Sequence, residues 1–367
     1  MKRVCALLCA CALLVAGITF LTPEAQAATV SGACGDNLTW TLDNDGTLTI
    51  SGEGPMWDAM NDDPSYDYHE NPWESVKQDI KKVVFNPGIT YVGAAAFLGC
   101  ENISQVTFTD SITALGNFAF WRCVNLEDFV LPQNLRSIGQ QCFDGCEKIT
   151  KVSIPDTVTF LDVQIFNGCS ALTEIYIGGQ AGGAYVYGNS PLGVCSALEI
   201  IQVSPDNFAL QAIDNVLYSK DGTTMVQYPA GKKDKVYVVP EMVTTIYQSA
   251  MQRNLYIEEI YFPSSLKTIE KYALGSCLNL REVHFAAPQS LTTIGELAFG
   301  WCSGLISVNL PDSVTDIGFN VFGGCTSLTG IWVGENNPNY SSDQQGALYN
   351  KDNKPTYYLP STCCHSS

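Results

Sequence analysis

Cysteine recurs along this chain at an almost constant interval. Cys100, Cys123, Cys146 and Cys169 are equally spaced, and Cys277, Cys302 and Cys325 resume the series after an interruption, with one interval slightly longer than the others. Self-similarity at a period of about 23 residues is typical of solenoids, in which each repeat packs only against its neighbours. The sequence therefore predicts a stack of repeats rather than one compact core.

The residues around each cysteine follow the same period. One unit reads Leu135-x-x-Ile138-Gly139-x-x-x-Phe143-x-x-Cys146-x-x-Ile149-x-x-Val152-x-Ile154-Pro155. Its Val-x-Ile end alternates apolar and polar residues, which predicts a short strand with the middle side chain facing outward. The segment before the cysteine is too short for a long helix, so we expect a tight turn or a single helical turn there. Proline directly follows several of these strands and ends the pairing, because it lacks the N–H that a ladder requires.

Residues 1–27 have the features of a secretory signal peptide. Lys2 and Arg3 precede an apolar run from Val4 to Leu21, and Ala25-Gln26-Ala27 has the small-x-small form that a signal peptidase accepts. We expect cleavage after Ala27 and export of the remainder. The alternative is a retained membrane anchor, since the apolar run could nearly span a bilayer. No later segment is apolar enough for membrane insertion after the signal is removed.

Hairpin signals flank and interrupt the array. Two alternating runs enclose Asp43-Asn44-Asp45-Gly46, the segment 216–229 has Asp-Gly at its centre, and the segment 347–360 matches it position for position. The predicted organisation, in chain order, is a signal peptide (1–27), an N-terminal β-hairpin cap (28–79), a first repeat block (80–203), a β-hairpin insertion (204–240), a second repeat block (241–333) and a partial second hairpin at the C-terminal end (334–367).

The periodic cysteines are expected to form a ladder of buried thiols. Three of the 15 cysteines lie in residues 1–27, which leaves 12, a number that suggests disulfides in an exported protein. Equivalent cysteines in stacked repeats would lie about 4.8 Å apart and point the same way, which is poor geometry for a bridge. Asn254 fills the cysteine position of one repeat, which supports a structural role in a turn. The redox state stays open for Cys34, Cys142, Cys195, Cys363 and Cys364.

Charge and motifs exclude several function classes. The chain has 37 Asp and Glu residues against 19 Lys and Arg, and its net charge of −18 repels nucleic acid. The histidines, His69, His284 and His365, belong to no metalloprotease motif, and no nucleophile elbow or phosphate loop is present. The acids between Asp58 and Glu70 lack the spacing of a calcium loop. The sequence predicts no catalytic residue, no bound metal and no cofactor.

The repeat unit resembles the BspA-type bacterial leucine-rich repeat. Two runs follow that pattern almost throughout, Ile294-Gly295-Glu296-Leu297-Ala298-Phe299-Gly300-Trp301-Cys302 and Leu305-Ile306-Ser307-Val308-Asn309-Leu310-Pro311. The resemblance implies a β-rich α/β solenoid, a right-handed leucine-rich-repeat superhelix with short strands on its concave side and short helical turns on its convex side, plus the hairpin cap and insertion. It also implies a secreted or cell-surface protein that mediates protein binding or adhesion, without a shared catalytic residue.

The middle residue of each predicted strand is a candidate for ligand binding on the concave face. These residues are Thr107, Val130, Ser153, Tyr176, Gln202, Tyr261, His284, Asn309 and Trp332, and acids before the strands add Asp128, Glu174, Glu259 and Glu282. Tyr and Trp offer a large contact area at a small cost in conformational entropy. We expect a monomeric, non-enzymatic protein that binds an extracellular protein through this face. The alternatives are a cell-surface glycan that stacks on the same aromatics, or a secreted hydrolase that uses Glu259 and Glu282 as paired acids.

Overall fold

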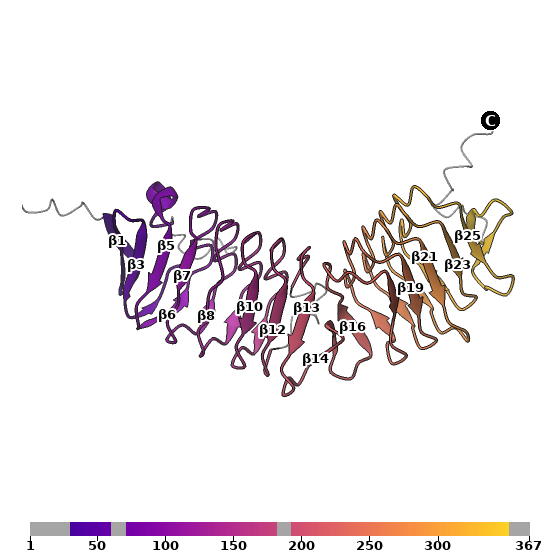
Figure 1. Ribbon diagram of the computed structural model, residues 1–367, viewed down its shortest axis with the longest axis horizontal. Helices are drawn as coiled ribbons and strands as arrows, with labels where there is room; N and C mark the ends of the chain where they lie inside the picture. The colour runs from indigo at the N-terminus through magenta and orange to yellow at the C-terminus, as the bar shows by residue number, and fades with distance from the viewer. Residues whose placement is uncertain (1–29, 60–70, 182–191, 352–367) are drawn as a thin grey trace, which may run out of the picture.

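The chain forms an elongated, curved stack of coils. The computed structural model describes residues 30–59, 71–181 and 192–351, and the stack progresses steadily from the N-terminal to the C-terminal end (Figure 1). The predicted solenoid is confirmed. Several predictions fall outside the described residues, namely the signal peptide (1–27), most of the acidic segment up to Glu70, the last strand of the C-terminal hairpin (357–360), and Cys363 and Cys364.

One strand of three or four residues follows the cysteine turn in most coils, and we call these the major strands. They are β5 (Lys82–Phe85), β7 (Gln105–Thr107), β10 (Lys151–Ile154), β12 (Glu174–Ile177), β13 (Ile200–Val203), β17 (Val236–Val238), β19 (Glu259–Phe262), β21 (Glu282–Phe285), β23 (Ser307–Leu310) and β25 (Gly330–Val333). Where two of them pair, they pair in parallel, because every coil winds in the same sense. The near-constant repeat length keeps equivalent residues in register.

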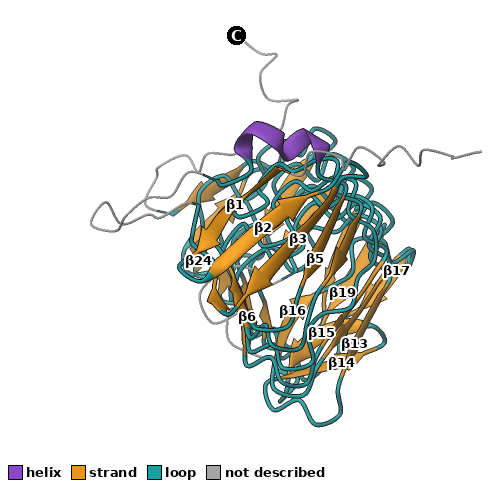
Figure 2. Cartoon of the chain, turned by 90° about the vertical axis from the view of Figure 1, so that its left-hand side faces the viewer, coloured by secondary structure: helices purple, strands orange, loops and turns teal. Residues whose placement is uncertain are grey.

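A second strand, in most cases of two residues, precedes the turn of most coils, and we call these the minor strands. They are β4 (Gly54–Pro55), β6 (Ile89–Val92), β8 (Ala114–Leu115), β9 (Ser137–Ile138), β11 (Phe160–Leu161), β16 (Thr224–Gln227), β18 (Thr245–Ile246), β20 (Thr268–Ile269), β22 (Thr293–Ile294) and β24 (Asp316–Ile317). Each pairs in parallel with the minor strand of at least one neighbouring coil. Figure 2 views the stack from its N-terminal end, with the coils lying one behind another.

The core lies between the two rows of strands and the turns. Inward residues such as Val152 and Ile154 are buried while Ser153 between them is exposed, as the alternation predicts. Stacked phenylalanine rings run through the first block, with centroids 5.0 to 5.6 Å apart at Phe97, Phe120, Phe143 and Phe166. Trp73 stacks on Phe97 at 4.9 Å and covers the N-terminal end of this row.

The turn side of the coils is not helical, and the predicted short helical turns are not found there. The described residues contain one helix, the 3-10 helix η1 (Glu74–Asp79), which lies directly before β5 and ahead of the cysteine-containing turns. Gln141 and Gly145 have positive φ values of 49° and 74°, which interrupt a right-handed helical path. The amide of Phe143 donates instead to the carbonyl of Ile165 in the next coil, at 2.9 Å. Consecutive β-turns therefore form a third hydrogen-bonded ladder along the stack.

Antiparallel strands begin the stack. They are β1 (Val30–Gly35), β2 (Leu38–Leu42) and β3 (Thr47–Gly52), with the turn of the second pair at Asp43–Gly46. Because β3 then pairs in parallel with β5, this unit continues the row of major strands.

The strands after the first block form a layer inside the stack. β14 (Leu210–Ile213), β15 (Val216–Ser219) and β16 are antiparallel, and β16 pairs in parallel with β18. Alternate side chains face different cores, since Leu217 and Val226 join the core of the first block while Tyr218 and Met225 join that of the second. Both repeat blocks therefore pack on this hairpin.

The C-terminal end repeats the same arrangement. β26 (Tyr340–Ser342) and β27 (Leu348–Asn350) are antiparallel, like β14 and β15. Each hairpin begins with a buried asparagine, Asn207 or Asn337, whose Nδ2 donates to two carbonyls of the preceding coil and whose Oδ1 accepts two local amides. These side chains fasten each hairpin to the coil before it.

Candidate functional site

The outward side chains of the major strands form one surface, which we call the major strand face. Ser153, Tyr176 and Gln202 are directly in register, as are Tyr261 with His284 and Asn309 with Trp332. Neighbouring members of such a row lie about 4.8 Å apart. All the predicted residues of this row in strands are exposed or partly exposed, whereas their sequence neighbours point into the core. Whether this face is the concave one stays a prediction.

One predicted strand is absent. Residues 129–131 form no strand, so the row of major strands is interrupted between β7 and β10. Asp128 takes part in a different contact, because its carboxylate accepts hydrogen bonds from the Thr150 amide and hydroxyl, both at 2.6 Å, and from the Lys151 amide at 3.1 Å. Val130 is consequently 78% exposed and borders a depression of about 240 Å³ rather than lying in a ladder.

Charge on the N-terminal half of the face is locally balanced. Glu174, one of the predicted binding acids, forms an ion pair of 2.8 Å with Lys151 on the neighbouring strand. Tyr176 is partly exposed and Gln202 exposed beside it. This half presents polar side chains without an uncompensated carboxylate in the row.

The C-terminal half brings four predicted residues together, and we call Glu259, Tyr261, Glu282 and His284 the acidic aromatic cluster. The rings of Tyr261 and His284 stack with centroids 4.3 Å apart and planes at 15°. Glu259 and Glu282 are direct partners on β19 and β21. The register of parallel strands therefore places two carboxylates beside two stacked rings.

One hydrogen bond and two close approaches between His284 and glutamate define the geometry of this cluster. The Tyr261 hydroxyl donates to Glu259 Oε2 at 3.1 Å, and this bond to a carboxylate raises the pKa of the phenol. His284 Nε2 lies 3.3 Å from Glu282 Oε2 and 4.0 Å from Glu259 Oε2. Within the described residues no lysine or arginine forms an ion pair with either glutamate. The cluster is a negatively charged site that suits a cation.

A break in the sheet lies next to the cluster. β21 and β23 do not pair, and a depression of about 250 Å³ between them is lined by Val283, His284, Phe285, Gln289, Asn309 and Pro311. The cause is an insertion between Phe285 and Leu291, where the preceding repeat has a shorter connection. We did not predict this break, although the longer interval between Cys277 and Cys302 is its signal in the sequence.

Trp332 lies on the far side of the break. Its ring packs over Gly330 of its own strand, where a Cβ atom would come within 2.5 Å of the ring. Trp332 and Tyr261 are each 39% exposed. Trp332 and Tyr261 are thus available to a partner on either side of the depression.

Residues 30–59, 71–181 and 192–351 lack two other kinds of functional feature. No group of three or more His, Cys, Asp or Glu side chains there has the geometry of a metal site. No helix in the described ranges is long and apolar enough to cross a membrane.

Comparison with known proteins identifies relatives of the fold. The family model of the BspA type leucine rich repeat region matches residues 75–190 and 235–362, in six copies. A leucine-rich repeat protein from Eubacterium ventriosum has a TM-score of 0.68 at 24% identity and covers 84% of this chain and 86% of its own. Pneumococcal vaccine antigen PcpA has a TM-score of 0.64 at 19% identity and covers 92% of each chain.

A further match is a leucine rich cell surface protein from Faecalibacterium prausnitzii. Its TM-score is 0.51 at 24% identity, and the match covers 84% of this chain and 96% of that one. No curated protein sequence matches this chain. At these identities the solved structures show the fold alone.

Proposed function

This chain belongs to the BspA-type leucine-rich repeat family, and on that premise we propose that it is a secreted or cell-surface protein that binds an extracellular protein through its major strand face. Repeat solenoids offer extended surfaces rather than deep pockets, which suits macromolecular partners. The similar proteins are described as a cell surface protein and a vaccine antigen, and residues 1–27 have the composition of a signal peptide.

The acidic aromatic cluster is the observation that carries this proposal. Partly exposed Tyr261 and His284 offer ring surface, and Glu259 and Glu282 offer charge that no lysine or arginine of the described chain neutralises. Aromatic side chains dominate binding hot spots, and complementary charge accelerates association. We therefore propose a partner whose docking segment is positively charged and contains lysine or arginine.

Binding to an array of purified extracellular proteins tests this proposal. The protein without residues 1–27 is expected to bind at least one member, and Tyr261→Ala with Trp332→Ala is expected to weaken that interaction roughly ten-fold or more. Thr107→Ala with Ser153→Ala, on the same face at the other end of the stack, is the matched control and should bind like the parent. Equal binding by all three proteins would place the site elsewhere.

Salt and charge test the electrostatic part separately. Glu259→Gln with Glu282→Gln keeps the shape of both side chains and removes their charge. We expect slower association and a weaker dependence on salt, because long-range attraction between exposed charges is screened by ions. An unchanged association rate would contradict a positively charged docking segment.

A glycan at the same face is the alternative ligand. Stacked rings also suit the faces of sugars, so a glycan array is probed in parallel with the protein array. Binding to glycans alone, lost in Tyr261→Ala with Trp332→Ala, would replace the protein partner by a carbohydrate.

A further inference from the structure

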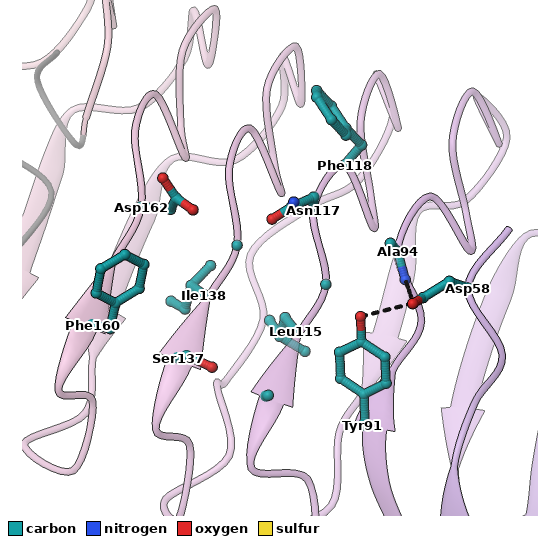
Figure 3. Close-up of a pocket in the computed structure, with 13 residues that line it drawn as sticks. Asp58, Tyr91, Ala94, Leu115, Asn117, Phe118, Ser137, Ile138, Phe160 and Asp162 are labelled. Carbon is teal, nitrogen blue, oxygen red and sulfur yellow. Dashed lines mark hydrogen bonds between the residues drawn. The ribbon is translucent and has the colours of Figure 1, made fainter. Parts of the chain in front are cut away.

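A groove of about 370 Å³ lies on the other row of strands, in the first repeat block (Figure 3). Tyr91 and Phe160 border its two ends, and the outward residues between them in the same row, Ala114 and Ser137, are small. We propose that this groove binds a short, uncharged oligosaccharide. The site is separate from the major strand face and does not depend on the function proposed for that face.

The register of the minor strands builds the groove. Tyr91, Ala114, Ser137 and Phe160 are consecutive partners on β6, β8, β9 and β11, so all four face outward in one row. Three strand spacings separate the outer two, about 14 Å. Two aromatic rings thus enclose a trough that is long enough for several linked sugar rings. Phe160 is 39% exposed, which leaves ring surface for stacking.

Backbone forms part of the floor. Gly116 and Gly139 line the groove, and a Cβ atom at either position would lie 2.5 to 2.6 Å from backbone nitrogen of the preceding coil. The first two equivalent positions of the second block carry Tyr247 and Glu270, and its outward row begins with three threonines, Thr245, Thr268 and Thr293. The second block therefore repeats the strands without the aromatic ends and, in its first two coils, without the small floor.

Three polar side chains at the rim, Asp58, Asn117 and Asp162, are each held in place by at least one hydrogen bond. Asp58 Oδ1 accepts hydrogen bonds from the Tyr91 hydroxyl at 2.8 Å and the Ala94 amide at 2.6 Å, which fixes the tyrosine ring (Figure 3). Asn117 Oδ1 accepts from the Gln140 amide at 3.0 Å, and Asp162 Oδ1 from the Val163 amide at 2.7 Å.

Among the described residues, Asp58 Oδ2, Asp162 Oδ2 and Asn117 Nδ2 have no hydrogen bond. The rim thus offers two acceptors and one amide donor, a combination that matches sugar hydroxyls, which both donate and accept. Aromatic faces with a few placed polar groups are a common composition of small-ligand sites.

Other ligand classes fit less well. An extended peptide would bind by pairing with a free strand edge, but β6, β8 and β9 are paired on both edges, and β11 is paired on the edge that faces the groove. Two carboxylates at opposite ends, together with the net charge of −18, disfavour an anionic sugar. Recognition must come from ring faces and side-chain hydrogen bonds, which favours an uncharged carbohydrate.

Titration with a panel of uncharged trisaccharides of glucose, mannose and N-acetylglucosamine tests the proposal by calorimetry and ligand-observed NMR. The protein without residues 1–27 should bind at least one member. Phe160→Ala should weaken binding about ten-fold, and Tyr91→Phe, which keeps the ring but loses the hydroxyl that fixes it, should weaken it less. Thr268→Ala, at an outward position of the second block, is the control and should bind like the parent.

The two proposals fail independently. Tyr261→Ala with Trp332→Ala should leave trisaccharide binding unchanged, and Phe160→Ala should leave binding to the protein array unchanged. Unfolding midpoints of all variants establish that each one is folded. No binding to any trisaccharide by the parent protein, equal binding by Phe160→Ala, or binding of basic peptides in place of sugars would overturn the oligosaccharide site.

Discussion

The thiol of Cys146 donates a hydrogen bond to the carbonyl oxygen of Phe120 in the preceding coil, with 3.2 Å between Sγ and O. The same bond, from a cysteine to the coil before it, recurs at Cys123, Cys169, Cys195, Cys277, Cys302 and Cys325. All ten cysteines of the described residues are free and buried. The predicted thiol ladder is confirmed there, and Cys34, Cys142 and Cys195 are thiols.

These thiols should be unreactive while the protein is folded. Burial raises the pKa of Cys100 and of Cys195 to about 12, so almost no thiolate is present at pH 8. We expect a thiol reagent to modify Cys363→Ser/Cys364→Ser protein lacking residues 1–27 only slowly at pH 8. In denaturant without reductant, all ten remaining cysteines should react at once. Rapid reaction of the folded protein, or fewer than ten reactive thiols in the unfolded one, would contradict the ladder.

Asn254 stabilises its coil more than a cysteine would. Its Nδ2 donates to the carbonyls of Pro229 and Lys232, at 3.2 and 3.1 Å, and its Oδ1 accepts the amide of Ile257 at 2.9 Å. Asn254→Ala leaves these buried groups without partners, so we expect a loss of about 3 kcal/mol or more in the free energy of unfolding. Asn254→Cys restores one donor and should lose less. Urea unfolding measures the loss of stability in both variants. Equal losses would show that the hydrogen-bond donor at this position does not stabilise the coil.

Glycine has two separate roles in the repeat. Gly99 has a φ of 67° and open space where a Cβ atom would be, so Gly99→Ala should cost only the strain of a left-handed residue, about 1 kcal/mol. At Gly116 a Cβ atom would lie 2.5 Å from the amide nitrogen of Ala94, so any side chain there forces this coil away from the preceding one. Gly116→Ala should therefore cost more, about 2 to 3 kcal/mol. Calorimetric unfolding compares the two, and the reverse order would contradict these roles.

Acid should remove the contribution of Asp128. Partial burial acts to raise the pKa of this carboxyl, but hydrogen bonds from Thr150 and Lys151 outweigh it and the net pKa is lowered. A carboxyl with a lower pKa in the folded state stabilises the protein above its unfolded pKa, about 3.9. That contribution disappears as the pH falls through the folded pKa. Asp128→Asn should thus be less stable than the parent at pH 7, with a gap that narrows toward pH 3. A constant gap in urea unfolding at both pH values would exclude this linkage.

The sequence predicted the buried positions correctly where the same type of residue recurs at the same position of every repeat. Cys146, Phe143 and the Val152–Ile154 alternation each identify an inward position, and the structure buries them as expected. Of the two alternatives for the turn, the structure has the tight turn and not the helical turn, because residues such as Gln141 adopt positive φ where the next coil accepts their hydrogen bonds. The strand predicted at residues 129–131 is absent for the same reason, since contacts with the neighbouring coils decide whether so short a segment pairs.

The repeat period by itself determined the solenoid, the inward residues and the outward row, because one-to-one stacking follows once every coil has nearly the same length. Only the tertiary structure decided which outward carboxylates have a basic side chain beside them and which do not. Glu174 forms an ion pair with Lys151 on the neighbouring strand. Glu259 and Glu282 instead lie opposite one another in the ladder, beside the stacked rings of Tyr261 and His284. Likewise, the groove between Tyr91 and Phe160 exists because their coils, far apart in sequence, lie on either side of two coils whose outward strand residues, Ala114 and Ser137, are small. Such neighbours depend on the register between coils, which no single repeat contains.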